Sequence, residues 1–290
     1  MKFGLRYCNT GKFAIDTALA TELVQAGEAA GFESAWTVEH TVIPSGYQSA
    51  YPYSPDGKMA GGVEDLLLPD PLMWMAYMSG VTSTINFATG ILIVPQHSPV
   101  VCAKQIATLD HMSGGRVLLG IGVGWMREEF DAIGVPFDDR GPRTDEYVAA
   151  MRELWSADRP TFHGEFVNFD AAYCRPQPVN GSVPIIVGGD SKVAARRAGR
   201  LGDGYFPARG APWDLIDLAR QTATEHGRDP DALEITVSVP ADLAEIPELA
   251  HRGVSRIAVP VSPMAGLQTV IATPDDASAW AETIERFADL

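Results

Sequence analysis

The sequence has few cysteines, few basic residues and no long apolar run. Its three cysteines, Cys8, Cys102 and Cys174, are odd in number and widely spaced, which supports neither a disulfide framework nor a zinc site. Lysine and arginine total 22 against 37 acidic residues, a net charge of −15, which disfavours binding to nucleic acid or anionic membranes. No stretch approaches the roughly 18 apolar residues of a membrane span, and the first residues do not form the apolar stretch of a signal peptide. The sequence therefore predicts a cytoplasmic protein that binds neither nucleic acid nor membrane.

The chain does have enough apolar sequence for a large core. Its 290 residues are 46% hydrophobic and 20% charged, a composition typical of folded globular proteins. Glycine (28) and proline (21) are abundant but dispersed, which indicates many short connections. The length is compatible with two domains or with one α/β barrel. Because no linker, repeat or charge block interrupts the chain, we expect a single domain over residues 1–290.

Short β-rich runs alternate with amphipathic stretches along the chain. The runs lack strict alternation of apolar and polar residues, which is typical of strands buried on both faces. Several amphipathic stretches begin beside proline, which suits the first turn of a helix. The expected strands are Phe3–Cys8, Ser34–His40, Ile85–Val94, Val117–Val123, Pro184–Gly188, Gly204–Ala208, Glu234–Val239 and Arg256–Val261. The expected helices are Thr17–Ala30, Pro71–Thr82, Pro99–Met112, Arg143–Trp155, Ser191–Leu201, Pro212–His226, Asp242–His251 and Pro274–Ala288.

Eight repeats of strand and helix predict an α/β fold of the (β/α)8 TIM-barrel type. A doubly wound open sheet is the alternative. Two segments fit neither element. Thr41–Pro69 is a long insertion after strand 2, expected as a lid, a pocket wall or a surface loop anchored by aromatic residues, and Phe162–Pro178 is typical of a hairpin appended before strand 5. Since barrels carry their chemistry at the C-terminal ends of the strands, we expect the functional residues there.

Two glycine-rich segments follow expected strands. Gly120–Trp125 has tryptophan where the dinucleotide-binding pattern GxGxxG needs its last glycine, so that pattern fails. Its glycines instead predict the close approach of a flat ligand or of a neighbouring backbone. Gly188, Gly189, Asp190 and Ser191 lie between a strand and a helix, where backbone amides and the Ser191 hydroxyl can hold a phosphate. They are also typical of a glycine turn in which Asp190 or Ser191 caps the helix.

One of the six histidines is expected at the C-terminal end of a strand. His40 follows Glu39, a carboxylate that can tune the pKa of the imidazole or remain a structural anion. His40 is therefore a candidate general acid or base, whereas His97 is expected as a loop or cap residue. The histidines form neither HxH nor HExxH, so no metal site is expected.

Four segments together resemble the luciferase-like monooxygenase superfamily of flavin and deazaflavin barrels. Trp36–His40 is similar to the family's second strand, and Thr89–Ile91 to a third-strand bulge with a non-prolyl cis peptide. Leu109–Gly124 is similar to the stretch into strand four, and Ile186–Gly204 to the fifth strand and its helix. Glu39–Pro44, with the tyrosines after it, looks closest to the branch that depends on coenzyme F420.

The resemblance implies an oxidoreductase that transfers a hydride between F420, a 5-deazaflavin, and a small, largely apolar organic substrate. It also implies a homodimer. His40 would be the general acid or base or would stabilise the reduced ring, and Glu39 would orient it or contact the ring. The coenzyme would be held by the third-strand bulge (Gly90, Ile91), by residues beside the pyrimidine or the tail (Val123, Gly124, Trp125), and by the phosphate loop (Gly188, Gly189, Asp190, Ser191).

The sequence departs from branch members that oxidise a sugar phosphate. Those members carry an acidic residue at the position of Trp125, so this chain is expected to have an apolar wall there instead. The chain is also short late in the sequence, leaving less protein to cover the F420 tail, and FMN would fit equally well. Two alternatives stay open: a two-component monooxygenase that uses reduced FMN and oxygen, and a flavin- or deazaflavin-binding barrel without turnover.

Overall fold

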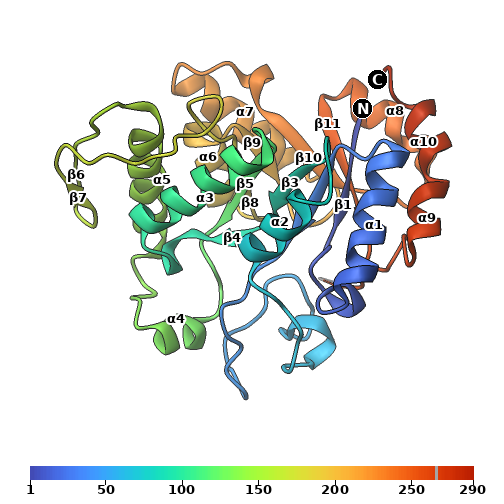
Figure 1. Ribbon diagram of the computed structural model, residues 1–290, viewed down its shortest axis with the longest axis horizontal. Coiled ribbons are helices and arrows are strands. Elements are labelled where there is room, and N and C mark those ends of the chain that lie inside the picture. The colour runs from blue at the N-terminus through green and yellow to red at the C-terminus, as the bar shows by residue number, and fades with distance from the viewer. Residues whose placement is uncertain (265–266) are drawn as a thin grey trace.

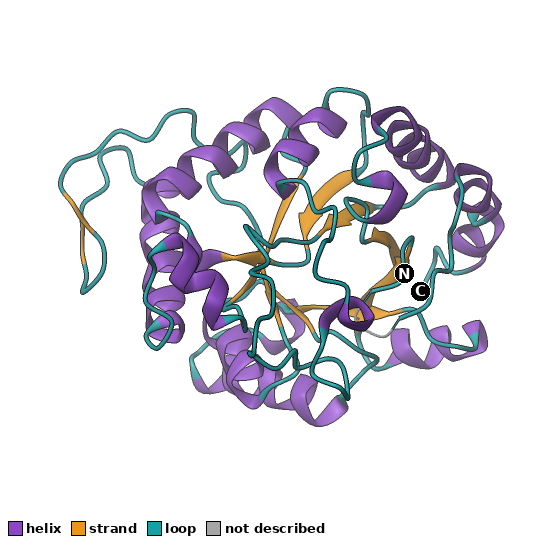
Figure 2. Cartoon of the chain, turned by 90° about the horizontal axis from the view of Figure 1, so that it is seen from below, coloured by secondary structure: helices purple, strands orange, loops and turns teal. Residues whose placement is uncertain are grey.

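Parallel strands close into a barrel at the centre of the molecule, and helices surround it (Figures 1 and 2). The computed structural model describes residues 1–264 and 267–290, apart from the side chains of residues 60 and 61. The strand order is β3-β2-β1-β11-β10-β9-β8-β5-β4, and β3 also pairs with β5, which closes the ring. Since β3 and β4 share one position, the strands fill eight positions and the predicted TIM barrel is confirmed. The barrel strands are β1 (Lys2–Arg6), β2 (Ser34–Thr37), β3 (Asn86–Thr89), β4 (Leu92–Ile93), β5 (Val117–Gly122), β8 (Ile185–Gly188), β9 (Gly204–Phe206), β10 (Glu234–Ser238) and β11 (Val254–Pro260).

Helices connect successive strands on the outside of the barrel (Figure 2). The α-helices are α1 (Thr17–Ala30), α2 (Pro71–Ser79), α3 (Pro99–Ser113), α4 (Arg127–Ile133), α5 (Arg140–Ser156), α6 (Lys192–Leu201), α7 (Trp213–Glu225), α8 (Ile246–His251), α9 (Pro274–Ala279) and α10 (Ala281–Arg286). Short 3-10 helices are η1 (Gly11–Phe13), η2 (Met59–Gly62), η3 (Val94–Gln96), η4 (Pro230–Ala232) and η5 (Leu243–Glu245). None of the helices in the described part of the chain is both long and apolar enough to cross a membrane.

The two main parts of the core lie outside and inside the ring of strands, as a barrel requires. The larger part fills the space between the strands and the helices. The smaller part joins side chains of five different strands, which places it inside the ring; there the rings of Trp36 and Phe206 meet edge to face with centroids 5.1 Å apart. Because both strand faces are buried, the strands read as continuous apolar runs.

Local hydrogen bonds determine where the elements end. Helix α1 has the predicted bounds because the Asp16 side chain accepts the N–H of Leu19 and Gly31 takes a left-handed φ of 95°. Strand β2 ends earlier than predicted. The side chain of Asn9 bonds both the N–H and the C=O of Val38, each at 2.8 Å, and so replaces the next rung of the strand ladder.

Two predicted elements are interrupted in the structure. The third strand is divided into β3 and β4, and the peptide bond between Gly90 and Ile91 is cis. The last predicted helix is divided into α9 and α10 at Trp280. The indole of Trp280 packs against Phe3 and Phe32, with ring centroids 6.0 and 5.9 Å apart, and this packing accounts for the turn.

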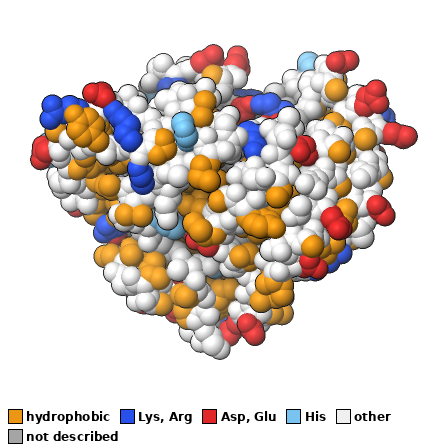
Figure 3. Space-filling view, in the orientation of Figure 1, with side chains coloured by type: hydrophobic (Ala, Val, Ile, Leu, Met, Phe, Trp, Pro, Cys, Tyr) orange, Lys and Arg blue, Asp and Glu red, His pale blue; other side chains and the backbone are white. Residues whose placement is uncertain are grey.

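The two predicted irregular segments lie in different parts of the molecule. The appended hairpin pairs β6 (Phe162–His163) with β7 (Asn168–Phe169) antiparallel and projects from the ring of helices in Figure 2. The insertion loop, Thr41–Pro69, and α4 lie below the barrel in Figure 1, beyond the C-terminal ends of the strands. In Figure 3 the molecule narrows toward this end.

Candidate active site

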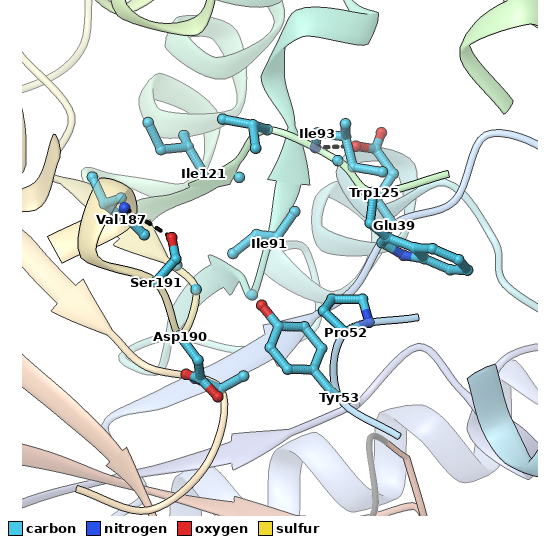
Figure 4. A pocket seen from close by; sticks show the side chains of 18 of the residues that line it. Glu39, Pro52, Tyr53, Ile91, Ile93, Ile121, Trp125, Val187, Asp190 and Ser191 are labelled. Atoms are coloured by element: carbon cyan, nitrogen blue, oxygen red, sulfur yellow. Dashed lines mark hydrogen bonds between the residues drawn. The ribbon is translucent and has the colours of Figure 1, made fainter. Parts of the chain in front are cut away.

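A cavity of about 650 Å³ lies at the C-terminal ends of the strands, where barrel chemistry is expected. Figure 4 shows its strand side, with Ile91 and Ile121, and the insertion loop beside it, with Pro52 and Tyr53. The structure brings together at this cavity all the site residues proposed from the sequence: Glu39, His40, Gly90, Ile91, Val123, Gly124, Trp125, Gly188, Gly189, Asp190 and Ser191.

His40 lies on the cavity wall and is paired with a carboxylate from α4. Its Nδ1 is 2.9 Å from Oε2 of Glu129, and Oε1 of Glu129 accepts the N–H of Thr41 at 2.6 Å. Glu129 is 1% exposed, so the imidazole and the amide stabilise a buried acid. With Nδ1–H donating to Glu129, Nε2 is the atom left to exchange a proton. This is the arrangement of a general acid or base whose tautomer is fixed by a carboxylate.

The Glu39 carboxylate forms hydrogen bonds with groups other than His40. Its Oε2 accepts the N–H of Ile93 at 2.5 Å (Figure 4), and its Oε1 is 2.8 Å from Nε2 of His97. The expectation that Glu39 orients His40 is therefore wrong, because both carboxylate oxygens of Glu39 are engaged by Ile93 and His97, and His40 is held by Glu129. That Glu39 contacts the ring of a coenzyme stays a prediction.

His97 caps η3, as its sequence context indicates, and it also holds Glu39. Burial lowers the pKa of His97, but the hydrogen bond and the negative charge of Glu39 outweigh it, so the pKa lies above its ordinary value.

Helix α4 holds the insertion loop in place. Oε1 of Glu128 accepts the N–H groups of Gln48 and Ser49 at 2.6 and 3.1 Å. In return, the hydroxyl of Ser49 accepts the N–H of Arg127 at 3.0 Å. Adjacent glutamates of one helix therefore fix the start of the loop, through Glu129, and its middle, through Glu128.

Trp125 forms the expected apolar wall between the loop and His40. Its ring centroid lies 5.0 Å from that of Tyr51, 5.4 Å from that of Tyr47 and 5.8 Å from that of His40. Together with Tyr53, Tyr51 also lines the cavity. The insertion loop is therefore a pocket wall, which is one of the three roles predicted for it.

The glycines of the strands make room for protein atoms. A Cβ on Gly122 would lie 2.6 Å from Cδ1 of Ile91, and one on Gly188 would overlap the Cγ2 methyl of the same side chain. A Cβ on Gly120 would overlap the carbonyl oxygen of Thr89. Of the two predicted reasons for the glycines of Gly120–Trp125, the neighbouring backbone applies at Gly120. Gly122 and Gly188 instead make room for the side chain of Ile91, which lines the cavity.

The segment before α6 combines a helix cap with a turn. The hydroxyl of Ser191 accepts the N–H of Ala194 at 3.1 Å, so Ser191 is the N-cap. Asp190 accepts the N–H of Ala208 at 2.5 Å, and burial raises the pKa of Asp190 above its ordinary value. Gly189 has a φ of 126°, which favours glycine. The capping interpretation is thus confirmed for Ser191, and phosphate binding stays a prediction.

Sequence reasoning missed Arg140, the first residue of α5, on the same side of the cavity. Its Nε donates to the carbonyl of Gly124 at 3.3 Å, and its guanidinium carbon is 3.7 Å from the centroid of the Phe137 ring. Among the described residues it has no carboxylate within 4.0 Å. An arginine without an acidic partner beside a helix N-terminus is suited to an anion.

Glu129 and Arg6 were also missed, and each left a signal. Glu129 lies in the connection after strand β5, where the barrel rule already directs attention. Arg6 is the last residue of β1, so the same rule applies to it. The strand was expected to continue to Cys8, so the rule pointed to Cys8 instead. Cys8 is fully buried, and burial raises the pKa of its thiol to about 12, so it is a packing residue.

The family model for luciferase-like monooxygenases matches residues 8–288. The chain belongs to this family. Its members are oxidoreductases or monooxygenases, and the predicted family is confirmed. An uncharacterized protein of Mycobacterium tuberculosis (strain H37Rv) is 35% identical over 231 residues, covering 77% of this chain and 80% of its own length.

Two further relatives differ in coenzyme. An FMNH2-dependent dimethylsulfone monooxygenase of Pseudomonas fluorescens is 32% identical over 212 residues. The alignment covers 71% of this chain but 53% of that enzyme. The solved structure of an F420-dependent secondary alcohol dehydrogenase with an F420-acetone adduct has a TM-score of 0.75 at 20% identity, covering 99% and 98% of the two chains. The fold is thus shared with enzymes of both coenzymes.

Proposed function

We propose that this protein transfers a hydride between coenzyme F420 and a small, largely apolar organic substrate. The observation that carries the proposal is His40 held by the buried carboxylate of Glu129 on the wall of an apolar cavity. A proton-exchanging group beside the reacting centre is what oxidation of an alcohol, or reduction of a carbonyl or activated alkene, requires in addition to the hydride.

The cavity suits a phosphate-bearing, flat coenzyme. Its volume falls within the roughly 300–1,000 Å³ of small-molecule sites. The first turn of α6 presents amides without intrahelical partners, and Arg140 brings a positive charge to the same side. Ile91, Val123 and Trp125 would border the ring. When bound, F420 supplies the ring carbon that accepts or donates the hydride.

His40 has a defined task in either direction. In oxidation, Nε2 accepts the proton of the substrate hydroxyl, and in reduction it returns that proton. Glu129 keeps Nδ1 protonated and stabilises the imidazolium that forms. Trp125 and the insertion loop keep water from the reacting groups.

An FMN-dependent monooxygenase is the second candidate. It is favoured by the 32% identity to the dimethylsulfone monooxygenase. A flavin- or deazaflavin-binding barrel without turnover is the third.

Fluorescence titration of the purified protein with F420 and, separately, with FMN tests the coenzyme. We expect tighter binding of F420, followed by turnover without oxygen when carbonyls, alkenes and alcohols are screened. A preference for FMN together with oxygen uptake in the presence of a flavin reductase would establish the monooxygenase instead. Binding of neither would reject both coenzymes.

Replacement of His40 tests its role. His40→Ala is expected to lower kcat about 10²- to 10⁴-fold, the usual contribution of a general acid or base, with little change in the Kd of the coenzyme. His163→Ala, which removes an exposed histidine paired with Asp170 on the hairpin, is the control and should turn over normally. Full turnover in His40→Ala would remove it from the mechanism.

We also infer a homodimer. Met73 and Tyr77 on α2 and Val100 and Val101 on α3 are exposed although apolar, and the two helices pack side by side. Figure 3 shows hydrophobic side chains on this face of the molecule. Burial of such side chains against a second copy would remove apolar surface from water.

A further inference from the structure

Two residues that line the cavity each have a buried polar atom without a hydrogen-bond partner among the described residues, and the proposed chemistry does not use them. Arg6 at the end of β1 is 4% exposed, and Tyr7, which follows with a φ of 71°, is 1% exposed. Within residues 1–264 and 267–290, neither Nε of Arg6 nor the hydroxyl of Tyr7 has a hydrogen-bond partner. Because an unpaired buried polar group costs roughly 1–3 kcal/mol, such groups call for an explanation, and a ligand is one.

The guanidinium of Arg6 is held in one orientation. Its carbon lies 4.5 and 4.6 Å from the ring centroids of Tyr7 and Phe206. Its Nη1 donates to the carbonyl of Ala208 at 3.1 Å and to the hydroxyl of Ser238 at 2.8 Å. These contacts use one corner of the guanidinium. The edge formed by Nε and Nη2 has no acceptor within the described chain.

The positive charge of Arg6 is not neutralised by the described residues, where no carboxylate lies within 4.0 Å of it. Two other arginines at the cavity are paired: Arg197 lies 2.5 Å from Asp145, and Arg209 lies 3.7 Å from Asp190. Asp190 in turn is engaged by the N–H of Ala208. Arg140, like Arg6, has no carboxylate within 4.0 Å among the described residues, but it is only partly buried. A buried cation is costly unless it is paired, so an anion is the ligand that this position favours.

We propose that Arg6 and Tyr7 form a subsite for the carboxylate of the substrate, so that the substrate is a small organic acid with an apolar remainder. The inference rests on the proposed function, because it assigns a substrate class to the same cavity. The free edge of a guanidinium matches the two oxygens of a carboxylate, and the hydroxyl of Tyr7 donates a third hydrogen bond.

The surroundings of this subsite fit the same substrate. Burial raises the pKa of Tyr7, so its hydroxyl keeps its proton and remains a donor. Tyr51 and Met59 pack with Tyr7 in one apolar cluster and line the cavity. They offer contacts to the apolar part of the acid, and their low polarity strengthens the charge pair.

Calorimetric titration of the coenzyme-free protein with benzoate and with benzamide tests the proposal. The two probes share shape, but benzoate alone carries the charge. We expect the Kd of benzoate to be at least tenfold lower than that of benzamide. Arg6→Met should abolish this preference, and Tyr7→Phe, which removes only a hydroxyl, should weaken benzoate binding several-fold. If Arg6→Met does not fold, two results still test the proposal: the preference of the wild type for benzoate over benzamide, and the effect of Tyr7→Phe on benzoate binding.

Arg140→Met is the matched control, because it removes another arginine from the same cavity, one that contacts Gly124 and belongs to the proposed phosphate site. It should weaken binding of inorganic phosphate and leave benzoate binding unchanged. Equal binding of benzoate and benzamide, or loss of benzoate binding in Arg140→Met rather than in Arg6→Met, would overturn the proposal. So would an equal loss of F420 or FMN binding in Arg6→Met, since Arg6 would then hold the coenzyme. None of these readouts requires turnover, so they are independent of the proposed reaction.

Discussion

At Gly120 the backbone of β5 passes so close to β3 that no side chain fits. The Thr89 side chain adds a direct link here, because its hydroxyl donates to the carbonyl of Gly120 at 2.6 Å. The glycine therefore keeps these neighbouring strands together just before the chain reaches Gly90 and Ile91 at the cavity.

Replacement of this glycine should be among the most destabilising single changes in the protein. We expect Gly120→Ala to lower the free energy of unfolding by about 4 kcal/mol or more, because the added methyl overlaps the carbonyl of Thr89. Chemical denaturation measures the loss. The control is Gly80→Ala, at a helix end with a φ of −77° and only an ordinary contact for the new Cβ; it should change stability by less than about 1 kcal/mol. Similar stability of the two variants would contradict this account.

At the level of the element, helix termini form two parts of the site. The first turn of α4 carries the glutamates that hold His40 and the insertion loop. The N-terminus of α6 faces the cavity, with Ser191 as its cap. One serine thus combines a structural hydrogen bond with a proposed contact to phosphate.

Two substitutions of Ser191 separate these roles. Ser191→Ala should destabilise the helix by about 1 kcal/mol and weaken binding of the phosphate-bearing coenzyme by about 1.5–3 kcal/mol. Ser191→Asp retains a good cap, so its thermal stability should stay near that of the wild type, but its negative charge should repel phosphate and weaken binding further. Fluorescence titration measures coenzyme binding, and thermal unfolding measures stability. Coenzyme binding of wild-type strength in Ser191→Asp would place the phosphate elsewhere.

In the whole molecule, the residues that stabilise the barrel and the residues proposed to carry the chemistry lie in different places. Helices cover the outside of the strands (Figures 1 and 2). Residues of the insertion loop and of the N-termini of α5 and α6 line the cavity at one end. The exposed apolar residues of α2 and α3 lie on the outside, apart from the lining of this cavity.

This arrangement lets the dimer be tested without altering the cavity. Light scattering after size exclusion should give twice the 31.1 kDa of one chain. Val101→Glu should give the monomer, because a charge would be buried in the proposed interface. Ile15→Glu changes an apolar residue elsewhere that is even more exposed than Val101, and it should leave the mass doubled. A wild-type mass near that of one chain would refute the dimer.

The sequence by itself determined the barrel and the positions of its strands, because strands buried on both faces and capped helices leave local patterns in hydrophobicity, glycine and proline. It also placed Glu39, His40, Gly90, Trp125 and Ser191 at the right end of the barrel, since that end follows from strand order. Local patterns carry no information on partners distant in the chain.

Only the tertiary structure paired His40 with Glu129 instead of Glu39, because the two residues are 89 positions apart and meet through the packing of α4 against the insertion loop. Only the tertiary structure shows that Arg6 has no carboxylate within 4.0 Å among the described residues. The counter-charge of Arg6 depends on which acidic side chains the closed ring brings near the end of β1. The strand pattern is thus a local property, whereas the charge pairs of the site depend on closure of the barrel.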